Sequence, residues 1–308
     1  MNSSYNIDIE GLFESLGLDE LTSKPKALSG GHLNRVYSAE TKRGKYAVKA
    51  INPQVIIRPS AIKNYMDSEN IAFIASSVIP AVAAKLYSGS ALQKYKDQYY
   101  LIYDFIEGEC LVYDSLTTKH CAVMGGFLAG LHKTDFSSLG LKDDYSGIEK
   151  AVDWEYYLNK GNEIHAPWVK AFAERNKKLY EWNDRLINAA SRLSYNTLIS
   201  HGDLEPKNVI WKDENPAIID WEAAGFVHPA YDLFENAIYW AKENDGSISE
   251  SKFKAFFIAY IVKAALPDID WEHVADKGFV MLGWLEYSLR RSLCMECADS
   301  EEQNMGTN

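Results

Sequence analysis

Apolar positions in the first hundred residues follow the spacing of short strands and then of one helix. Residues 34–41 and 46–51 are strand-like runs, and the polar, glycine-containing stretch between them predicts a hairpin turn. Residues 61–77 are predicted to form a helix, because their apolar side chains recur at spacings of three and four residues. Two further strands are expected at 84–87 and 98–105.

After Gly108 the pattern changes to long stretches with helical spacing, interrupted by one block of strand and loop at 197–220. Helices are expected at 115–133, 166–193, 231–243, 251–264 and 272–296. Together the two patterns predict an α+β fold with a small β-rich N-terminal lobe and a larger, mainly α-helical C-terminal lobe. The expected boundaries are 1–105 for the first lobe, 106–110 for a hinge and 111–308 for the second lobe.

Composition narrows the class of protein. The 308 residues are 47% hydrophobic and 24% charged, which is usual for a globular protein. No run of apolar residues is long enough to span a membrane, and the polar first ten residues lack the pattern of a signal peptide, so we expect a cytoplasmic protein without a membrane partner. The net charge of −11 argues against nucleic acid as a partner.

The four cysteines do not indicate a metal site. Cys294 and Cys297 form a C-x-x-C pair, but no further ligands at suitable spacing lie nearby, so we expect reduced thiols.

Charge is distributed unevenly along the chain. Residues 1–104 hold 12 basic and 10 acidic side chains, whereas the remaining residues hold 20 and 33. This distribution suits an anionic ligand in the first part and a cationic one in the second. The alternative is that an acidic surface serves solubility.

One loop carries most of the candidate chemistry. His201-Gly202-Asp203 is followed by Asn208 and, twelve residues later, by Asp220, with apolar runs on either side. A loop closed by a hairpin would bring Asp203, Asn208 and Asp220 together. Phosphoryl transfer needs a carboxylate to orient the attacking hydroxyl, and Mg²⁺ can be held by one carboxylate and one amide oxygen. The alternative, that these residues only form turns, does not account for their spacing.

The first lobe offers candidates for a phosphate-bearing ligand. Ala47 and Lys49 share one face of a strand, where the small side chain leaves room for a flat base and the ammonium can reach phosphate oxygens. Glu69 lies on the apolar stripe of the 61–77 helix, so we expect a cationic partner for it, with Lys49 the natural candidate. The alternative is a half-exposed Glu69 with no special partner.

These motifs resemble the aminoglycoside phosphotransferase and choline kinase family, a branch of the protein-kinase-like fold. The resemblance covers residues 28–235 and is strongest in the catalytic block. The matching segments are His201-Gly202-Asp203 with Asn208, Ile219-Asp220-Trp221-Glu222, Pro229 and Asp232-Leu233.

The resemblance implies roles for several of the matching positions. Asp203 would be the catalytic carboxylate, Asn208 and Asp220 the Mg²⁺ ligands, and His201 and Asp232 braces of the catalytic loop. ATP or GTP would be the co-substrate. Its phosphates would meet the Lys49–Glu69 pair and a loop containing Gly30 and Gly31, and its base would lie near Ala47 and the backbone of Phe105. His132 would be structural.

Two departures favour the small-molecule branch over protein kinases. Trp-Glu follows Asp220 in place of Phe-Gly, and no Arg precedes Asp203. The stretch between Asp220 and Tyr231 is also short for a peptide-binding activation segment. A catalytically inactive nucleotide-binding protein is the other alternative, but such a protein is expected to lose Asp203, Asn208, Asp220 or Lys49.

The acceptor is predicted to be a small cation with a hydroxyl group, held by acidic and aromatic side chains. An aminoglycoside-like antibiotic fits best, and choline, other amino alcohols, sugars and homoserine stay open. Glu235 and Trp240 are the leading acceptor-binding candidates. The other candidates are Asp153, Trp154, Glu155, Tyr239, Trp284 and Glu286.

Overall fold

The structure is a computed structural model that describes residues 5–28, 34–143, 150–295 and 300–307. The chain forms two compact units. The first contains residues 1–142, 199–225 and 236–264, and the second contains 143–198, 226–235 and 265–308. This division does not follow the lobe boundary expected at 106–110, which stays a prediction.

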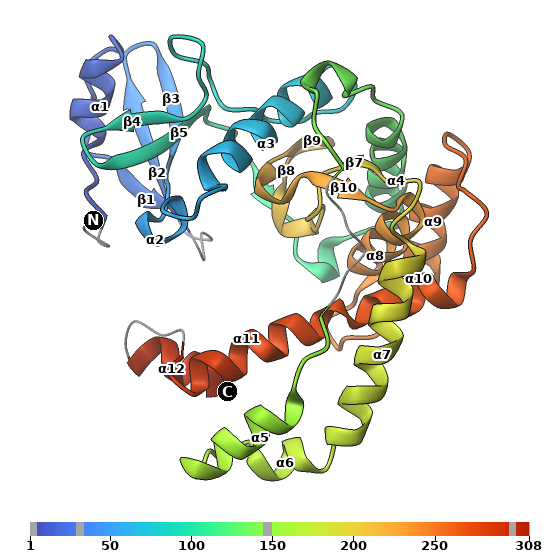
Figure 1. The fold of residues 1–308 in the computed structure, drawn as a ribbon. Helices are drawn as coiled ribbons and strands as arrows, with labels where there is room; N and C mark the ends of the chain where they lie inside the picture. The colour runs from blue at the N-terminus through green and yellow to red at the C-terminus, as the bar shows by residue number, and fades with distance from the viewer. Residues whose placement is uncertain (1–4, 29–33, 144–149, 296–299, 308) are drawn as a thin grey trace. The chain divides into compact units, whose positions relative to one another are not determined.

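An antiparallel five-stranded sheet lies in the N-terminal part of the first unit, at the upper left of Figure 1. Its order is β1 (Lys26–Leu28), β2 (Arg35–Thr41), β3 (Gly44–Ala50), β5 (Gln98–Asp104) and β4 (Gln93–Tyr95). The predicted hairpin is present, with Thr41 opposite Gly44 at the turn between β2 and β3.

Alternation along the strands gives the sheet two apolar faces. Val48 and Ile102 pack on one face against α1 (Ile9–Ser15). Leu101 packs on the other with Tyr65 of α3 (Ala61–Ala75). Because Lys49 alternates with Val48, its side chain belongs to the α3 face, which is what brings a lysine close to that helix.

The strand expected at 84–87 is absent from the structure. The N–H of Lys85 donates to the carbonyl of Ile102 in β5 at 2.7 Å, but the N–H of Ala84 donates to Oε2 of Glu69 at 2.6 Å, so no continuous strand pairing forms here. The β4 strand lies later, at Gln93–Tyr95, and pairs with β5. The short elements α1 and β1 were not expected from the sequence pattern.

The first unit also contains a three-stranded sheet. The strand β6 (Glu109–Cys110) pairs with β8 (Val209–Lys212), which pairs with β9 (Asn215–Ile218). The short strands β7 (Leu198–Ser200) and β10 (Gly225–Val227) each contain residues of both units. Other helices of the first unit are α2 (Pro53–Ile56), α4 (Thr118–His132), α9 (Glu250–Ile261) and part of α8 (Pro229–Ala241).

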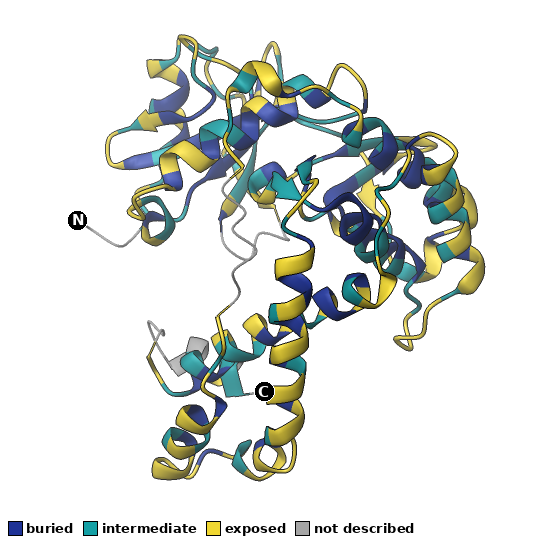
Figure 2. Cartoon of the chain, turned by 45° about the vertical axis from the view of Figure 1, so that its right-hand side comes forward, coloured by how far each residue is buried: buried dark blue, intermediate teal, exposed yellow. Residues whose placement is uncertain are grey.

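The second unit is helical. Its elements are α5 (Trp154–Glu163), α6 (Val169–Ala173), α7 (Asn176–Arg192), α10 (Trp271–Lys277), α11 (Leu282–Ser292) and α12 (Ser300–Thr307). Buried positions recur at helical spacing along α7, so one side of the helix faces the core and the other faces solvent (Figure 2). Its core contains Trp154, Phe172, Leu179, Leu282 and Leu289.

Two predicted helices are broken in this unit. The helix expected at 166–193 is divided into α6 and α7, and the one expected at 272–296 is divided by a 3-10 turn at Gly278–Met281. Helices α6 and α7 pack on the same core, which contains Phe172 and Leu179, so apolar spacing runs through their break. Helix α10 instead contributes Val274 to a second cluster with Leu193 and Tyr231, whereas α11 packs on the first core.

Two further findings concern membrane-spanning helices and the state of the cysteines. No helix in the described ranges is both long enough and apolar enough to cross a membrane. Cys110 and Cys121 are free thiols as expected, whereas Cys294 is disulfide-bonded, so the expectation that it is reduced was wrong.

The close contact between α4 and α9 leaves no room for a side chain at Gly125. A Cβ atom at Gly125 of α4 would lie 2.1 Å from the carbonyl oxygen of Phe256 in α9. We therefore expect Gly125→Ala to lower the free energy of unfolding by about 1–3 kcal/mol in urea denaturation. The matched control is Gly130→Ala on the same helix, where the nearest atom lies at 3.4 Å. The control is expected to be neutral or slightly stabilising, and equal losses for both variants would contradict the prediction.

Candidate active site

The catalytic loop is held between two short strands. The strand β7 leads into residues 201–208, and β8 and β9 then form a hairpin that pairs Val209 with Ile218. One residue beyond that pairing, the N–H of Ile219 donates to the carbonyl of Asn208 at 2.9 Å. The hairpin therefore places Asn208 beside the start of the segment that carries Asp220.

Asp203 is fixed by the loop's own residues. The side-chain amide of Asn208 donates to Oδ2 of Asp203 at 2.9 Å and to its backbone carbonyl at 2.8 Å. The ammonium of Lys207 lies 3.3 Å from Oδ1 of Asp203. A third of the Asp203 side chain remains exposed, so the carboxylate is oriented and still accessible to a reactant.

His201 ties this loop to the Asp220 segment. Its Nε2 lies 3.0 Å from the carbonyl oxygen of Ile219, and its Nδ1 lies 3.2 Å from the backbone nitrogen of Asp203. Because a carbonyl only accepts hydrogen bonds, Nε2 must carry the proton and Nδ1 must accept from the Asp203 N–H. The fully buried ring also lies against Trp221, with 4.6 Å between ring centroids.

Backbone geometry limits the choice of residues here. Gly202 has a φ of +75°, and a Cβ atom on it would lie 2.2 Å from the carbonyl oxygen of Ala223, so only glycine fits. Asp220 itself has a φ of +64° in the left-handed region. Aspartate tolerates this conformation better than most residues do, and such strain is common at functional sites.

Lys49 pairs with two carboxylates from the Asp220 segment. Its ammonium lies 2.8 Å from Oδ1 of Asp220 and 2.6 Å from Oε1 of Glu222. Burial alone would lower the pKa of Lys49, but the two carboxylates outweigh burial and raise the pKa above its usual value. Lys49 is therefore a fixed cation beside the metal-ligand candidate Asp220.

The predicted ion pair between Lys49 and Glu69 is not formed. Glu69 accepts hydrogen bonds from the Tyr103 hydroxyl at 2.6 Å and from the N–H of Ala84. Burial raises the pKa of Glu69, and these two hydrogen bonds offset part of that increase. The expectation of a cationic partner for the buried Glu69 was wrong, because neutral donors satisfy its carboxylate.

Glu222 lies in a matching segment of the sequence, but sequence reasoning assigned no role to it. It accepts from the Asn34 side-chain amide at 2.8 and 3.0 Å, and the Tyr65 hydroxyl lies 3.4 Å away. The Oδ1 atom of Asn34 accepts from the N–H of Asn52 at 2.8 Å, which fixes the orientation of that amide. The one signal in the sequence was an acidic residue two positions after Asp220.

The remaining nucleotide candidates are only partly brought together. Ala47 lies on β3, two residues before Lys49. The N–H of Phe105 donates to the carbonyl of Lys45 at 3.0 Å, so a purine would bond to other backbone groups near Phe105, and that contact stays a prediction. The Lys45 ammonium lies 3.6 Å from the centroid of the Phe105 ring. Gly30 and Gly31 lie outside the described residues.

The donor atoms present fit a magnesium ion. Asp220 has one carboxylate oxygen, Oδ2, that is not paired with Lys49, and Asn208 has an amide oxygen whose NH₂ group is used by Asp203. An amide and a carboxylate oxygen are hard ligands of the kind that Mg²⁺ prefers, with water completing its shell. Among the described residues no three His, Cys, Asp or Glu side chains form a larger metal cluster.

The two acceptor-binding candidates have different surroundings. Trp240 is fully buried, and its indole N–H donates to the carbonyl of Leu204 at 2.8 Å. It therefore supports the catalytic loop from within, and the prediction that its ring contacts an acceptor does not fit this position. Glu235 belongs to the second unit and accepts from the hydroxyl of Tyr231.

The other predicted residues also have definite places. Asp232 is buried in the first turn of α8, within the second unit, and its contact with the catalytic loop stays a prediction. Asp153 caps α5, Trp154 is buried in the core, and Trp284 is exposed. His132 contacts the hydroxyls of Tyr260 at 2.7 Å and Ser200 at 3.3 Å, so it connects α9 to the strand that enters the catalytic loop.

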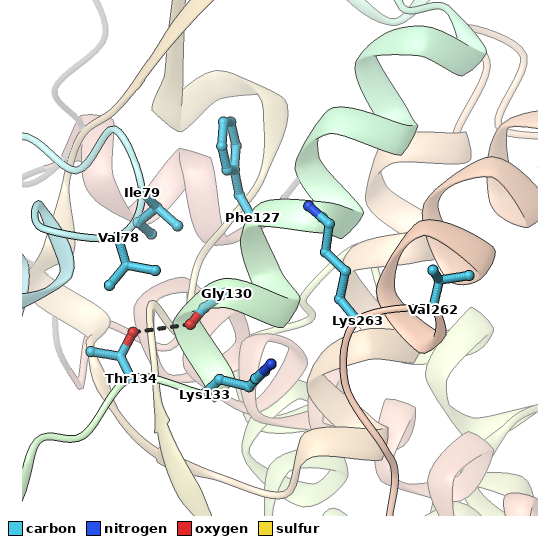
Figure 3. A pocket seen from close by; sticks show the side chains of 9 residues that line it. Val78, Ile79, Phe127, Gly130, Lys133, Thr134, Val262 and Lys263 are labelled. Atoms are coloured by element: carbon cyan, nitrogen blue, oxygen red, sulfur yellow. Dashed lines mark hydrogen bonds between the residues drawn. The ribbon is translucent and has the colours of Figure 1, made fainter.

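A pocket of about 550 Å³ lies elsewhere in the first unit (Figure 3). Its wall contains none of the predicted site residues. It is lined by Val78, Ile79, Gly126, Phe127, Gly130, Lys133, Thr134, Val262 and Lys263. In Figure 3, the hydroxyl of Thr134 donates to the carbonyl of Gly130 at 3.0 Å, which satisfies a carbonyl near the C-terminal end of α4.

Comparison with known families identifies this arrangement. The sequence profile of the APH phosphotransferase enzyme family matches residues 24–272. The chain belongs to the APH phosphotransferase family. The matched range contains Lys49 and the whole segment from His201 to Glu222.

Solved structures show the same fold at low sequence identity. A spectinomycin phosphotransferase, APH(9)-Ia, in complex with ADP and spectinomycin, is 14% identical with a TM-score of 0.71, covering 98% of this chain and 93% of that one. The amicoumacin kinase hAmiN, in complex with AMP-PNP, Ca²⁺ and Ami, is 14% identical with a TM-score of 0.62 and coverages of 98% and 91%.

A choline kinase from Cryptosporidium parvum is 14% identical with a TM-score of 0.54, covering 97% of this chain and 92% of that one. No curated protein matches the sequence. The predicted kinase-like α+β fold is thereby confirmed, and this APH-family protein is a phosphotransferase of the kinase type.

The position of Trp240 gives a test of its role. Trp240→Phe removes the donor to Leu204, which leaves a buried carbonyl unsatisfied, so we expect a loss of about 1–3 kcal/mol in the free energy of unfolding. Because the loop carries Asp203, kcat should fall while the acceptor KM stays unchanged. The matched control is Trp211→Phe, since Trp211 is also buried but its indole N–H has no partner among the described residues. A raised acceptor KM with unchanged stability would instead support direct contact with the acceptor.

Proposed function

We propose that this protein transfers the terminal phosphoryl group of ATP or GTP to a hydroxyl group of a small cationic molecule, with an aminoglycoside-like antibiotic as the leading acceptor class. The observation that carries the proposal is the convergence of Lys49, Asp203, Asn208 and Asp220 within the first unit. Hydrogen bonds and ion pairs link these residues into one continuous network.

Each residue has a role that its surroundings support. Asp203 is oriented by Asn208 and Lys207 and is partly exposed, so it can accept a hydrogen bond from the attacking hydroxyl and align it. Lys49 supplies a fixed positive charge for phosphate oxygens. The main work of such a site is positioning and charge stabilisation, because phosphoryl transfer requires little covalent help from the protein.

Asn208 and Asp220 are the residues that would hold Mg²⁺. When bound, the ion neutralises charge on the phosphates and bridges them to the protein. The protein's own part is to fix these two ligands, through the contact between Ile219 and Asn208 and through the ion pair between Lys49 and Asp220.

The cationic acceptor is supported by the distribution of charge. The second unit holds 20 acidic and 11 basic side chains, so it carries most of the net charge of −11. An acidic surface raises the local concentration of a cationic molecule. Among proteins of the same fold, the spectinomycin phosphotransferase and the amicoumacin kinase act on antibiotics by name, and the choline kinase is named for an amino alcohol. Choline, other amino alcohols, sugars and homoserine are therefore the remaining acceptor classes.

The acceptor is best tested with purified protein, Mg²⁺ and either ATP or GTP against a panel of hydroxyl compounds. We expect phosphorylation of at least one polycationic antibiotic, detected as a mass increase of one phosphate group. Preferential turnover of choline, a sugar or homoserine would assign the acceptor to that class. No turnover of any acceptor, together with no binding of Mg²⁺-nucleotide, would contradict the proposal and favour an inactive binding protein.

Asp203→Ala tests the assignment of the catalytic carboxylate. We expect kcat to fall by about two to four orders of magnitude, because the variant lacks the group that aligns the hydroxyl. Affinity for Mg²⁺-nucleotide, measured by isothermal titration calorimetry, should remain within about threefold, since Lys49 and Asp220 are unchanged. The control is Asp135→Ala, an exposed aspartate whose carboxylate accepts from the neighbouring residue Ser137. Lost nucleotide affinity in a folded Asp203 variant would give Asp203 a different role.

A further inference from the structure

Glu222 places a second carboxylate on the lysine that the proposed function assigns to the phosphates. The Lys49 ammonium meets both Glu222 and Asp220 within 2.8 Å, and its side chain is only 11% exposed. One cation thus faces two anions, so the local charge of this group is −1. A polyphosphate without a metal ion would meet this excess negative charge.

The position of the Glu222 carboxylate is fixed by hydrogen bonds. Asn34 donates to both of its carboxylate oxygens, and Asn34 is itself held through the N–H of Asn52. The Tyr65 hydroxyl also donates to Oε2 of Glu222, at 3.4 Å. Since Asn34 is 6% exposed, the amide that orients Glu222 is buried, and the carboxylate cannot turn away from Lys49 without leaving a buried donor unpaired.

The carboxylate on α3 does not serve this purpose. Glu69 is occupied by Tyr103 and Ala84 and makes no ion pair with Lys49 in the described structure. Both counter-charges of Lys49 therefore come from the segment that also carries the metal-ligand candidate Asp220. Asp220 and Glu222 would therefore have to offset both the charge of Lys49 and the charge of a metal ion held by Asp220.

We propose that Glu222, oriented by Asn34, makes nucleotide binding depend on the metal ion. With Glu222 and Asp220 both on Lys49, the site repels a free nucleoside diphosphate or triphosphate. A divalent cation held by Asn208 and Asp220 would offset the excess negative charge, and Lys49 would then be able to interact with the phosphates. This inference rests on the proposed function for the identity of the ligand, and it adds a positioning and charge-setting residue to it.

The test compares ADP affinity with EDTA and with Mg²⁺ for wild-type protein and Glu222→Gln. The variant keeps an oxygen for Asn34 but loses the charge. In EDTA we expect ADP to bind about tenfold more tightly to the variant, because a like charge a few ångströms from the phosphates has been removed. With Mg²⁺ the affinity should change by less than about threefold, so the ratio of the two dissociation constants falls. The effect in EDTA should shrink as KCl is raised, since salt screens charge interactions.

Two further variants separate charge from structure. Glu243→Gln is the matched control, because Glu243 also pairs with a lysine, Lys252, whose side chain is 11% exposed like that of Lys49. It removes the same charge elsewhere in the first unit and should leave both affinities unchanged. Asn34→Ala leaves the charge but frees Glu222, so it should reproduce part of the effect and add nothing when combined with Glu222→Gln.

The outcomes distinguish this inference from the proposed function. If wild-type protein binds neither Mg²⁺-ADP nor Mg²⁺-GDP, the proposed nucleotide is wrong and the inference fails with it. If wild-type protein binds but Glu222→Gln weakens binding in EDTA, or lowers both affinities equally, Glu222 has only a structural role and the inference alone is overturned. Circular dichroism on every variant confirms folding, and Asn34→Ala tests the inference if Glu222→Gln does not fold.

Discussion

The active site depends on one short contact between two loops. The carbonyl of Ile219 faces Nε2 of His201, and the N–H of Ile219 donates to the carbonyl of Asn208. One peptide segment therefore holds both ends of the catalytic loop, with Asp203 between them and Asp220 next in the chain. Because the His201 ring is fully buried, water does not compete for these bonds. The relative positions of Asp203, Asn208 and Asp220 follow from this contact.

Charge at the site is balanced within the same segment. Asp220 and Glu222 share the ammonium of Lys49, while Glu69 is satisfied by neutral donors on the α3 face of the sheet. A kinase-like site can thus keep its lysine in place without a carboxylate from the helix. Lys49 and the metal-ligand candidate Asp220 are therefore electrostatically coupled, because their charged groups lie 2.8 Å apart.

Several residues near the catalytic loop support its structure and take no part in the proposed chemistry. Trp240 holds the loop through Leu204, and His132 links α9 to the strand before the loop. Gly202 is required because a neighbouring carbonyl occupies the space of a side chain. Aromatic and histidine residues near a catalytic loop are therefore poor guides to ligand contacts, because the buried loop backbone needs hydrogen-bond donors of its own.

The sequence by itself determined the class of fold, the family and the catalytic block, because alternating and helical apolar patterns are local and the motif has fixed spacing in one segment. It also indicated that Glu69 is buried, although the cationic partner expected for it was wrong. Only the tertiary structure decided which partners: Tyr103 and Ala84 for Glu69, and Glu222 with Asp220 for Lys49. Such pairings join residues up to 173 positions apart, and several donors and acceptors could satisfy each one. The choice among them follows from how the sheet, α3 and the hairpin pack, which no local pattern contains.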